Sequence, residues 1–316
     1  MFARRDFLTA LLAPVILPRV AVAQIRREES VLPIRVLTLN HVSFGCDDLK
    51  ATVAWFGWVF GLPVHAFQDY SGTVNPSSGG QTVVRVGDGP QPSYMGLSQR
   101  SKNSIGQPPN RRPHFCWGAE DFNVDRILRG LSEMEAPAQA VLREGKTING
   151  VNFDTPDGFP LQFNPVNACG GGGFLGDVCD AGAKVERPAG APPLIPVKTL
   201  NNVRMIVPNL QRSLAWTLKL TDMYALAVPG PTKILRVGKG PQFIAMSEGN
   251  GPEAFKPHVG FGVQGFNGDQ VMARLTEHGV NARKNERDGV TEILVDSPDG
   301  IEIGLQDVSY CGSRSC

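Results

Sequence analysis

The chain contains the same sequence pattern twice, and this repeat limits the folds that it can adopt. "RVGDGPQ" at 85–91 returns as "RVGKGPQ" at 236–242, with six of the seven residues identical. Three further segments return in the same order, namely 41–55 at 202–216, 112–125 at 256–269 and 153–163 at 295–305. Such ordered similarity indicates a duplicated module, so we expect two domains of one fold.

Each copy has the same alternation of strands and helices. Apolar periodicity predicts a strand followed by a helix in both copies, at 36–44 and 47–60 and again at 198–207 and 209–220. A second helix is predicted at 123–133, and a strand hairpin then turns at Asp157-Gly158, because Asp-Gly between alternating strands favours a tight turn. Each copy is therefore expected to consist of two β-α-β-β-β halves.

The first 23 residues have the pattern of an export signal. A charged start with Arg4 and Arg5 precedes a short apolar run, and "AVA" at 21–23 resembles a cleavage site. The paired arginines resemble the twin-arginine signal. We expect a mature protein that begins at Gln24 and is periplasmic or otherwise exported. No later run approaches 18 apolar residues, so no stable membrane insertion is expected after signal removal.

Composition and loop-rich stretches set the domain boundaries. We predict an export signal at 1–23, a first module at 34–166, a Gly/Pro-rich linker at 167–196, a second module at 197–309 and a C-terminal tail at 310–316. Without the signal, 28 basic residues face 29 acidic ones, from 31 and 30 in the whole chain. A nearly neutral chain without basic runs gives no electrostatic footprint for nucleic acid.

The six cysteines do not fall into the CxxC spacing of zinc sites. Four of them lie in Gly- or Ser-rich segments and are expected to be oxidised in an exported protein, namely Cys169, Cys179, Cys311 and Cys316. Local pairs 169–179 and 311–316 are one possibility, but the sequence does not determine the pairing. Cys46 and Cys116 lie in or beside predicted core elements and are expected to be buried free thiols.

Three motifs resemble those of the vicinal oxygen chelate superfamily, namely "LNHV" at 39–42, "RPHF" at 112–115 and "DTPDGFPLQF" at 154–163. That superfamily includes glyoxalase I, the extradiol catechol dioxygenases and the bleomycin-resistance proteins, and the resemblance covers nearly all of 34–309. It implies an α+β fold of tandem βαβββ repeats, with two modules that each form an open mixed β-sheet cup flanked by helices. A cup of this family holds a divalent metal.

The resemblance also implies where metal ligands would lie. They come from the first strand, from the first strand of the second half, and from a Glu four residues after the last hairpin glycine. The first copy has His41, His114 and Gln162 at these places, and the second has Asn202, His258 and Gly304. We therefore predict a metal in the first cup and a degenerate second cup without a third donor. The alternative is that His41 and His114 are hydrogen-bonded core residues, and that His258 is a core or pocket residue.

The ligand set indicates which metals could bind, and the expected strands add candidates for catalysis. Fe²⁺, Mn²⁺ or Zn²⁺ would suit the ligand set, and Gln162 would bind through its carbonyl oxygen, as glutamine does in some glyoxalases. His65, on the expected second strand, is a candidate acid or base, and Tyr94 a candidate for orienting the substrate.

Three functional classes remain open from the sequence. The first is a metal-dependent enzyme of the glyoxalase or extradiol dioxygenase kind, acting on a small molecule with vicinal oxygens. The second is a metal-free binding protein of the bleomycin-resistance kind. The third is a lyase or isomerase in which the metal acts only as a Lewis acid. A homo-oligomer is possible in each case.

Overall fold

The computed structural model describes residues 30–68, 81–87, 93–100, 114–143, 147–168, 192–250, 258–287 and 290–313. The expected signal and most of the expected linker lie outside these residues, as do Cys169, Cys179 and Cys316. Contacts divide the chain into Met1–Ser30 and Val31–Cys316, and the helices and strands belong to the second part. Over the described residues, no helix is long and apolar enough to cross a membrane.

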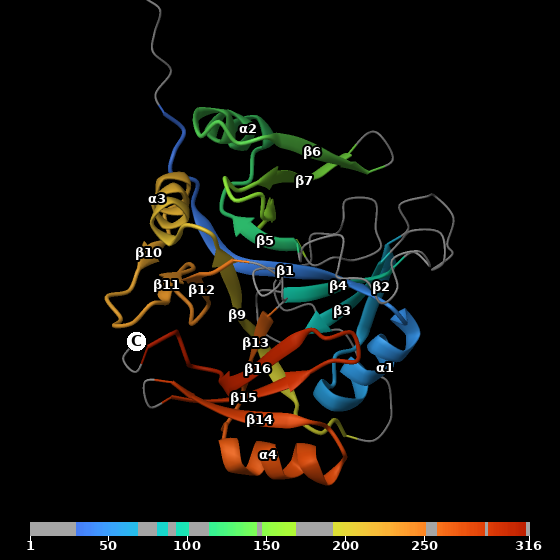
Figure 1. The fold of residues 1–316 in the computed structure, drawn as a ribbon. Coiled ribbons are helices and arrows are strands. Elements are labelled where there is room, and N and C mark those ends of the chain that lie inside the picture. The colour runs from blue at the N-terminus through green and yellow to red at the C-terminus, as the bar shows by residue number, and fades with distance from the viewer. Residues whose placement is uncertain are drawn as a thin grey trace, which may run out of the picture. The chain divides into compact units, whose positions relative to one another are not determined.

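The first module is an eight-stranded mixed sheet with two helices (Figure 1). Its elements are β1 (Val36–Cys46), α1 (Leu49–Phe60), β2 (Val64–Gln68), β3 (Gln81–Val86), β4 (Ser93–Gln99), β5 (His114–Ala119), α2 (Val124–Glu133), β6 (Ala138–Arg143), β7 (Thr147–Asp154) and β8 (Pro160–Pro165). The strand order is β2-β3-β4-β1-β5-β8-β7-β6, in which β1 pairs in parallel with β4 and antiparallel with β5.

The second module repeats this arrangement. Its elements are β9 (Val197–Val207), α3 (Leu210–Leu220), β10 (Tyr224–Ala225), β11 (Lys233–Arg236), β12 (Phe243–Glu248), β13 (His258–Val263), α4 (Gly268–Glu277), β14 (Ala282–Arg287), β15 (Val290–Asp296) and β16 (Glu302–Asp307). The order β10-β11-β12-β9-β13-β16-β15-β14 matches that of the first sheet. The predicted α+β fold with two mixed sheets is thus confirmed.

Local sequence accounts for where the helices begin. The residues that precede α1, α2, α3 and α4 are Asp48, Asn123, Asn209 and Asn267, and each accepts a hydrogen bond from the amide three residues later. These caps satisfy amides that have no partner inside the helix. Gly61 ends α1 in the left-handed conformation, as its place after the apolar run predicts.

The predicted hairpin turns have the same geometry in both modules. In the first, the hydroxyl of Thr155 accepts the amide of Phe159 at 3.0 Å, and in the second Ser297 accepts the amide of Ile301 at 3.1 Å. The hydroxyl residue of "TPDG" and "SPDG" therefore closes each turn, which confirms the turn expected at Asp157-Gly158.

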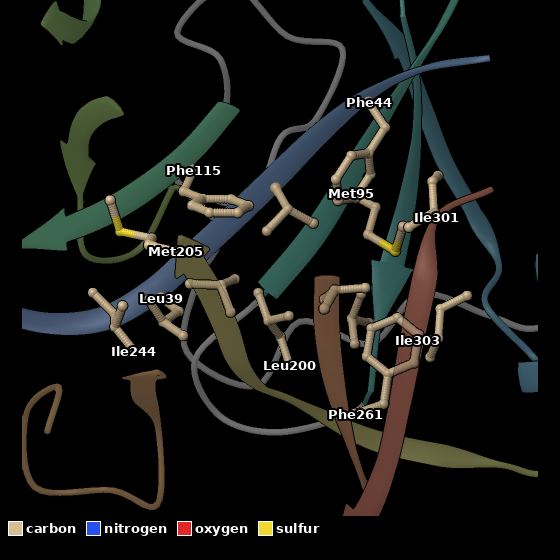
Figure 2. Close-up of a cluster of buried hydrophobic side chains, with 14 of the residues drawn as sticks. Leu39, Phe44, Met95, Phe115, Leu200, Met205, Ile244, Phe261, Ile301 and Ile303 are labelled. Carbon is tan, nitrogen blue, oxygen red and sulfur yellow. The ribbon is translucent and has the colours of Figure 1, made fainter. Parts of the chain in front are cut away.

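One hydrophobic core is shared by the two modules. Alternate residues of the central strands enter it from both sheets, and Figure 2 shows this cluster. The labelled members from the two modules are Leu39, Phe44, Met95, Phe115, Leu200, Met205, Ile244, Phe261, Ile301 and Ile303. The intervening residues point to the other face of each sheet, because side chains alternate along a strand. We call that other face the cup of each module.

The modules also contact one another through paired backbone groups. The amide of Ile34 donates to the carbonyl of Leu220 at 2.8 Å, and the amide of Ile195 donates to the carbonyl of Val59 at 2.8 Å. These residues are equivalent in the two copies, being 161 positions apart in sequence. Each module therefore completes the end of the other module's first helix.

The hairpin aspartates make a second reciprocal contact. Asp157 of the first module accepts hydrogen bonds from Arg212 and Ser213 at the start of α3. Its counterpart Asp299 accepts the hydroxyl of Thr52 in α1 and, at 2.5 Å, the amide of Asp47. The Pro-Asp-Gly motif thus fixes the relation between modules as well as the turn.

Candidate functional site

Three aromatic rings lie side by side in the first cup. His41 on β1 has Tyr94 on β4 as its Cα partner, and their rings stack with centroids 4.3 Å apart. The ring of His114 on β5 lies on the same histidine, with centroids 5.5 Å apart and planes within 10°. The structure therefore brings together His41 and His114, as the sequence predicts, and places Tyr94 beside them.

Hydrogen bonds orient both imidazoles. Nε2 of His114 lies 2.8 Å from Oε1 of Gln162 on β8, and Nδ1 of His41 lies 3.0 Å from Oδ1 of Asn40. An amide oxygen only accepts, so Nδ1 of His41 donates in this hydrogen bond. Burial lowers the pKa of His114 and keeps this imidazole neutral.

Cys116 lies on β5 with His114, between the strands of His41 and Gln162, but is a poor ligand. Its Cα is the partner of His41 on one side and of Gln162 on the other. Complete burial raises the pKa of its thiol well above the usual value, so the thiolate that a metal requires is disfavoured. The donors of the first cup are therefore two imidazoles and one amide.

Arg85 is a residue that the sequence reasoning did not single out. It lies on β3 as the Cα partner of Tyr94, is only 3% exposed, and belongs to the repeated "RVGDGPQ" motif. Burial lowers the pKa of its guanidinium, and its Nη1 has no hydrogen-bond partner among the described residues. Its counterpart Arg236 instead donates to the carbonyls of Gly240 and Cys311. The repeat gave a signal for this arginine, but the signal did not distinguish the two copies.

His65 does not lie beside the histidine pair. It is on β2, at the edge of the sheet, and β3 and β4 separate it from β1. Three strand spacings correspond to about 14 Å between backbones. Its role as an acid or base therefore stays a prediction.

The second cup contains a carboxylate where the sequence predicted no third donor. A Cβ built on Gly304 would lie 2.3 Å from Oε1 of Glu292, which comes from the neighbouring strand β15. Nε2 of His258 lies 3.7 Å from the same oxygen, and its Nδ1 lies 2.8 Å from Oε1 of Glu302. Strand β15 thus supplies a polar side chain beside Gly304 that the motif positions did not indicate. That the second cup lacks a third metal donor stays a prediction.

The second cup also contains a cavity of about 770 Å³. Its polar lining includes Asn202, Arg204, Asn285, Glu292 and Gln306, and a small apolar cluster forms another wall. Across the residues that the structure describes, no group of three or more His, Cys, Asp or Glu side chains is placed to hold a metal ion. The first cup offers two histidines and an amide, and therefore only two side chains of these four types.

The cysteines follow the sequence prediction as far as the structure describes them. Cys46 and Cys116 are buried free thiols. Cys311 is disulfide-bonded, and its partner lies outside the described residues.

Comparison with known proteins adds a result for the fold. No family model and no curated protein sequence matches the chain. Solved structures do match, among them the 2,3-dioxygenase LapB from Pseudomonas sp. KL28, with a TM-score of 0.61, 14% identity, and coverage of 90% of this chain and 96% of that one. A variant of homoprotocatechuate 2,3-dioxygenase from Brevibacterium fuscum gives 0.62, 12%, 90% and 75%, and a catechol 2,3-dioxygenase gives 0.58, 11%, 89% and 91%. The chain therefore has the two-module vicinal oxygen chelate fold found in extradiol dioxygenases.

Proposed function

We propose that the protein is a metal-dependent enzyme of the extradiol dioxygenase or glyoxalase kind that acts on a small molecule with vicinal oxygens. The observation that carries this proposal is the first cup, where Nε2 of His114 and Oε1 of Gln162 lie 2.8 Å apart beside the stacked ring of His41. Donors from three strands that meet on one face are the arrangement in which proteins hold a catalytic metal with open positions.

The donor set fits a divalent metal with imidazole preference, such as Fe²⁺, Mn²⁺ or Zn²⁺. Nδ1 of His41 is held by Asn40, as the outer nitrogen of a ligating histidine usually is. All three donors are neutral, so the bound ion would keep its full charge. Such an ion would polarise the adjacent oxygens of a chelated substrate.

Two further residues would position the substrate. Tyr94 lies against His41 and presents a phenol in the same row of side chains. Arg85, its neighbour on β3, holds a buried cation whose Nη1 has no hydrogen-bond partner in the described structure. We assign Arg85 the binding of an anionic or strongly polar group of the substrate, because a buried guanidinium is costly unless it is paired.

Metal content tests the proposal. The mature protein, refolded with Fe²⁺, Mn²⁺ or Zn²⁺, should contain one ion per chain by elemental analysis, and His41→Asn or His114→Ala should remove it. Gln162→Ala should weaken binding, and Gln162→Glu should strengthen it by adding a charged oxygen. His258→Ala in the other cup is the matched control and should leave the metal content unchanged.

The second candidate is a metal-free binding protein. It is favoured by the hydrogen bond between His114 and Gln162, which satisfies both groups without an ion. A wild-type protein that takes up no metal, together with His41→Asn that changes only the melting temperature, would establish this candidate and reject the first. Loss of a packed ring and its hydrogen bond would cost roughly 1–4 kcal/mol.

Export is a separate part of the proposal. We infer a twin-arginine signal in residues 1–23 from Arg4, Arg5 and the apolar run that follows. Replacing both arginines by lysine should retain the precursor in the cytoplasm, as cell fractionation would detect. Unchanged export of this variant would contradict the twin-arginine reading.

A further inference from the structure

The cavity of the second cup has a polar floor whose side chains are fixed by one another. Nε2 of Gln306 donates to Oε1 of Glu292 at 2.5 Å, and Nδ2 of Asn285 donates to Oε2 of the same carboxylate at 3.1 Å. Nδ2 of Asn202 donates to Oε1 of Gln306 at 3.0 Å. A network of this kind holds its members in place before any ligand arrives, which lowers the cost of binding.

Two groups on β9 remain available to a ligand. Both hydrogen bonds of Asn202 use its Nδ2, so within the described structure its Oδ1 accepts none. Nη1 of Arg204 donates to Glu302 at 3.3 Å, whereas Nη2 lies 4.0 Å from Glu292, beyond hydrogen-bond distance. The floor therefore offers an acceptor and a donor two residues apart on one strand. A hydroxyl group can satisfy either or both, because it donates and accepts.

The charges of the lining cancel. Arg204 and Glu292 are the charged residues among those that line the cavity. Beside the floor, Ile234, Phe243 and Ala245 form a buried apolar cluster, against which Tyr310 packs, and Phe243 and Ala245 are the Cα partners of Asn202 and Arg204. The ring of Phe243 meets that of Tyr310 edge to face at 5.5 Å. A pocket of this size with an apolar wall and few fixed polar groups is typical of sites for small organic molecules.

The second cup has an interior that is organised for a ligand and not one that has lost its role. Gln162 fills the space over Gly150 in the first cup, and Glu292 fills the space over Gly304 in the second. A cup that had lost its role would be expected to fill with apolar side chains, since these pack without the cost of buried polar groups. Instead the second cup gained a carboxylate together with three amide side chains that meet it or one another.

We propose that the second cup is a metal-free binding site for a small, uncharged molecule with an apolar body and a hydroxyl-bearing end. The hydroxyl end lies against Asn202 and Arg204, and the body lies against Phe243 and its neighbours. This site is distinct from the metal site proposed for the first cup and does not depend on it.

Three probes of one size and different charge test this site, namely benzyl alcohol, benzylamine and benzoate. Binding is measured on the whole mature protein by ligand-observed NMR and calorimetry, before and after chelation of metals. We expect benzyl alcohol to bind at least about tenfold more tightly than either ion, a difference of about 1.4 kcal/mol. Binding should survive chelation, which separates this site from the first cup. Equal affinity for all three probes, loss on chelation, or no binding at millimolar concentrations would reject the proposal.

Substitutions that change the charge or the volume of the cavity test the same site independently. Glu292→Gln removes the negative charge from the cavity lining and leaves Arg204 as its charged residue, so it should shift preference towards benzoate. Arg204→Gln leaves Glu292 instead and should shift preference towards benzylamine. Ala245→Phe should abolish binding by filling the cavity, with an unchanged circular dichroism spectrum as evidence of folding. Trp58→Ala, on the exposed surface of the first module, is the control and should change nothing. Unaltered probe preference in folded Glu292 and Arg204 variants would overturn the assignment.

Discussion

In the first cup the long polar side chain belongs to Gln162 on β8, and a glycine, Gly150, lies on the neighbouring strand β7. In the second cup the order is reversed. Strand register makes Gly304 equivalent to Gln162 and Glu292 equivalent to Gly150, because Asn152 pairs with Gln162 as Leu294 pairs with Gly304. The sequence predicted His41, His114 and Gln162 from motif positions alone. It could not predict Glu292, since the place of this side chain beside Gly304 depends on how β15 pairs with β16, and only the folded sheet defines that pairing.

This exchange predicts coupled effects of substitution. Gly304→Glu alone should destabilise the protein by about 1–3 kcal/mol, because its Cβ would meet the carboxylate of Glu292. Glu292→Gly alone should cost a similar amount, roughly 1–3 kcal/mol, by leaving Gln306 and Asn285 without their acceptor. The double variant returns one carboxylate to the cup and should lose at least ~1 kcal/mol less than the sum. Denaturant titrations measure all three, and strict additivity would contradict the exchange.

Elements that depend on neighbouring residues were predicted well, and those that depend on distant pairing were not. The helix at 47–60 and the Asp157-Gly158 turn were predicted from local signals, and the structure has both. The parallel pairing of β1 with β4 joins segments about 50 residues apart, and no local pattern specifies it.

The most strongly repeated motif also has a structural role that its sequence does not indicate. The glycines of "RVGDGPQ" and "RVGKGPQ" lie where each module meets the other: a Cβ on Gly87 would lie 1.7 Å from the carbonyl oxygen of Lys198, and one on Gly238 would lie 2.3 Å from that of Leu37.

The close approach at Gly87 gives a prediction with a matched control. Gly87 and Gly279 have almost the same positive φ, 73° and 72°, but nothing lies within 4 Å of a Cβ built on Gly279. Gly279→Ala should therefore cost only the conformational term, about 1 kcal/mol. Gly87→Ala must also displace the backbone of Lys198 and should cost at least ~2 kcal/mol more. Urea unfolding midpoints compare the two, and equal losses would show that the contact between modules is loose.

At the scale of the whole molecule, the duplication predicted two modules but not their mutual dependence. Sequence similarity indicates that both copies adopt one fold, whereas no local pattern indicates that the hydroxyl groups of Thr52 and Ser213, at equivalent places in the two helices, contact the other module. The structure pairs these reciprocally with Asp299 and Asp157. The core extends through both sheets, so either module alone would expose much of it (Figure 2).

The shared core predicts that the modules fold together. Two polypeptides, 24–180 and 181–316, would each lose half of the core and the backbone bonds of Ile34 or Ile195 to the other module. Each buried apolar side chain contributes about 1.5–3 kcal/mol, which exceeds the margin by which a domain is stable once several are exposed. We expect each piece alone to be unfolded or aggregated, co-expression to give a folded pair, and the intact protein to unfold in one transition. Calorimetry and the near-ultraviolet circular dichroism of the separate pieces measure this, and two independent transitions that match those of the isolated pieces would show that each module carries its own core.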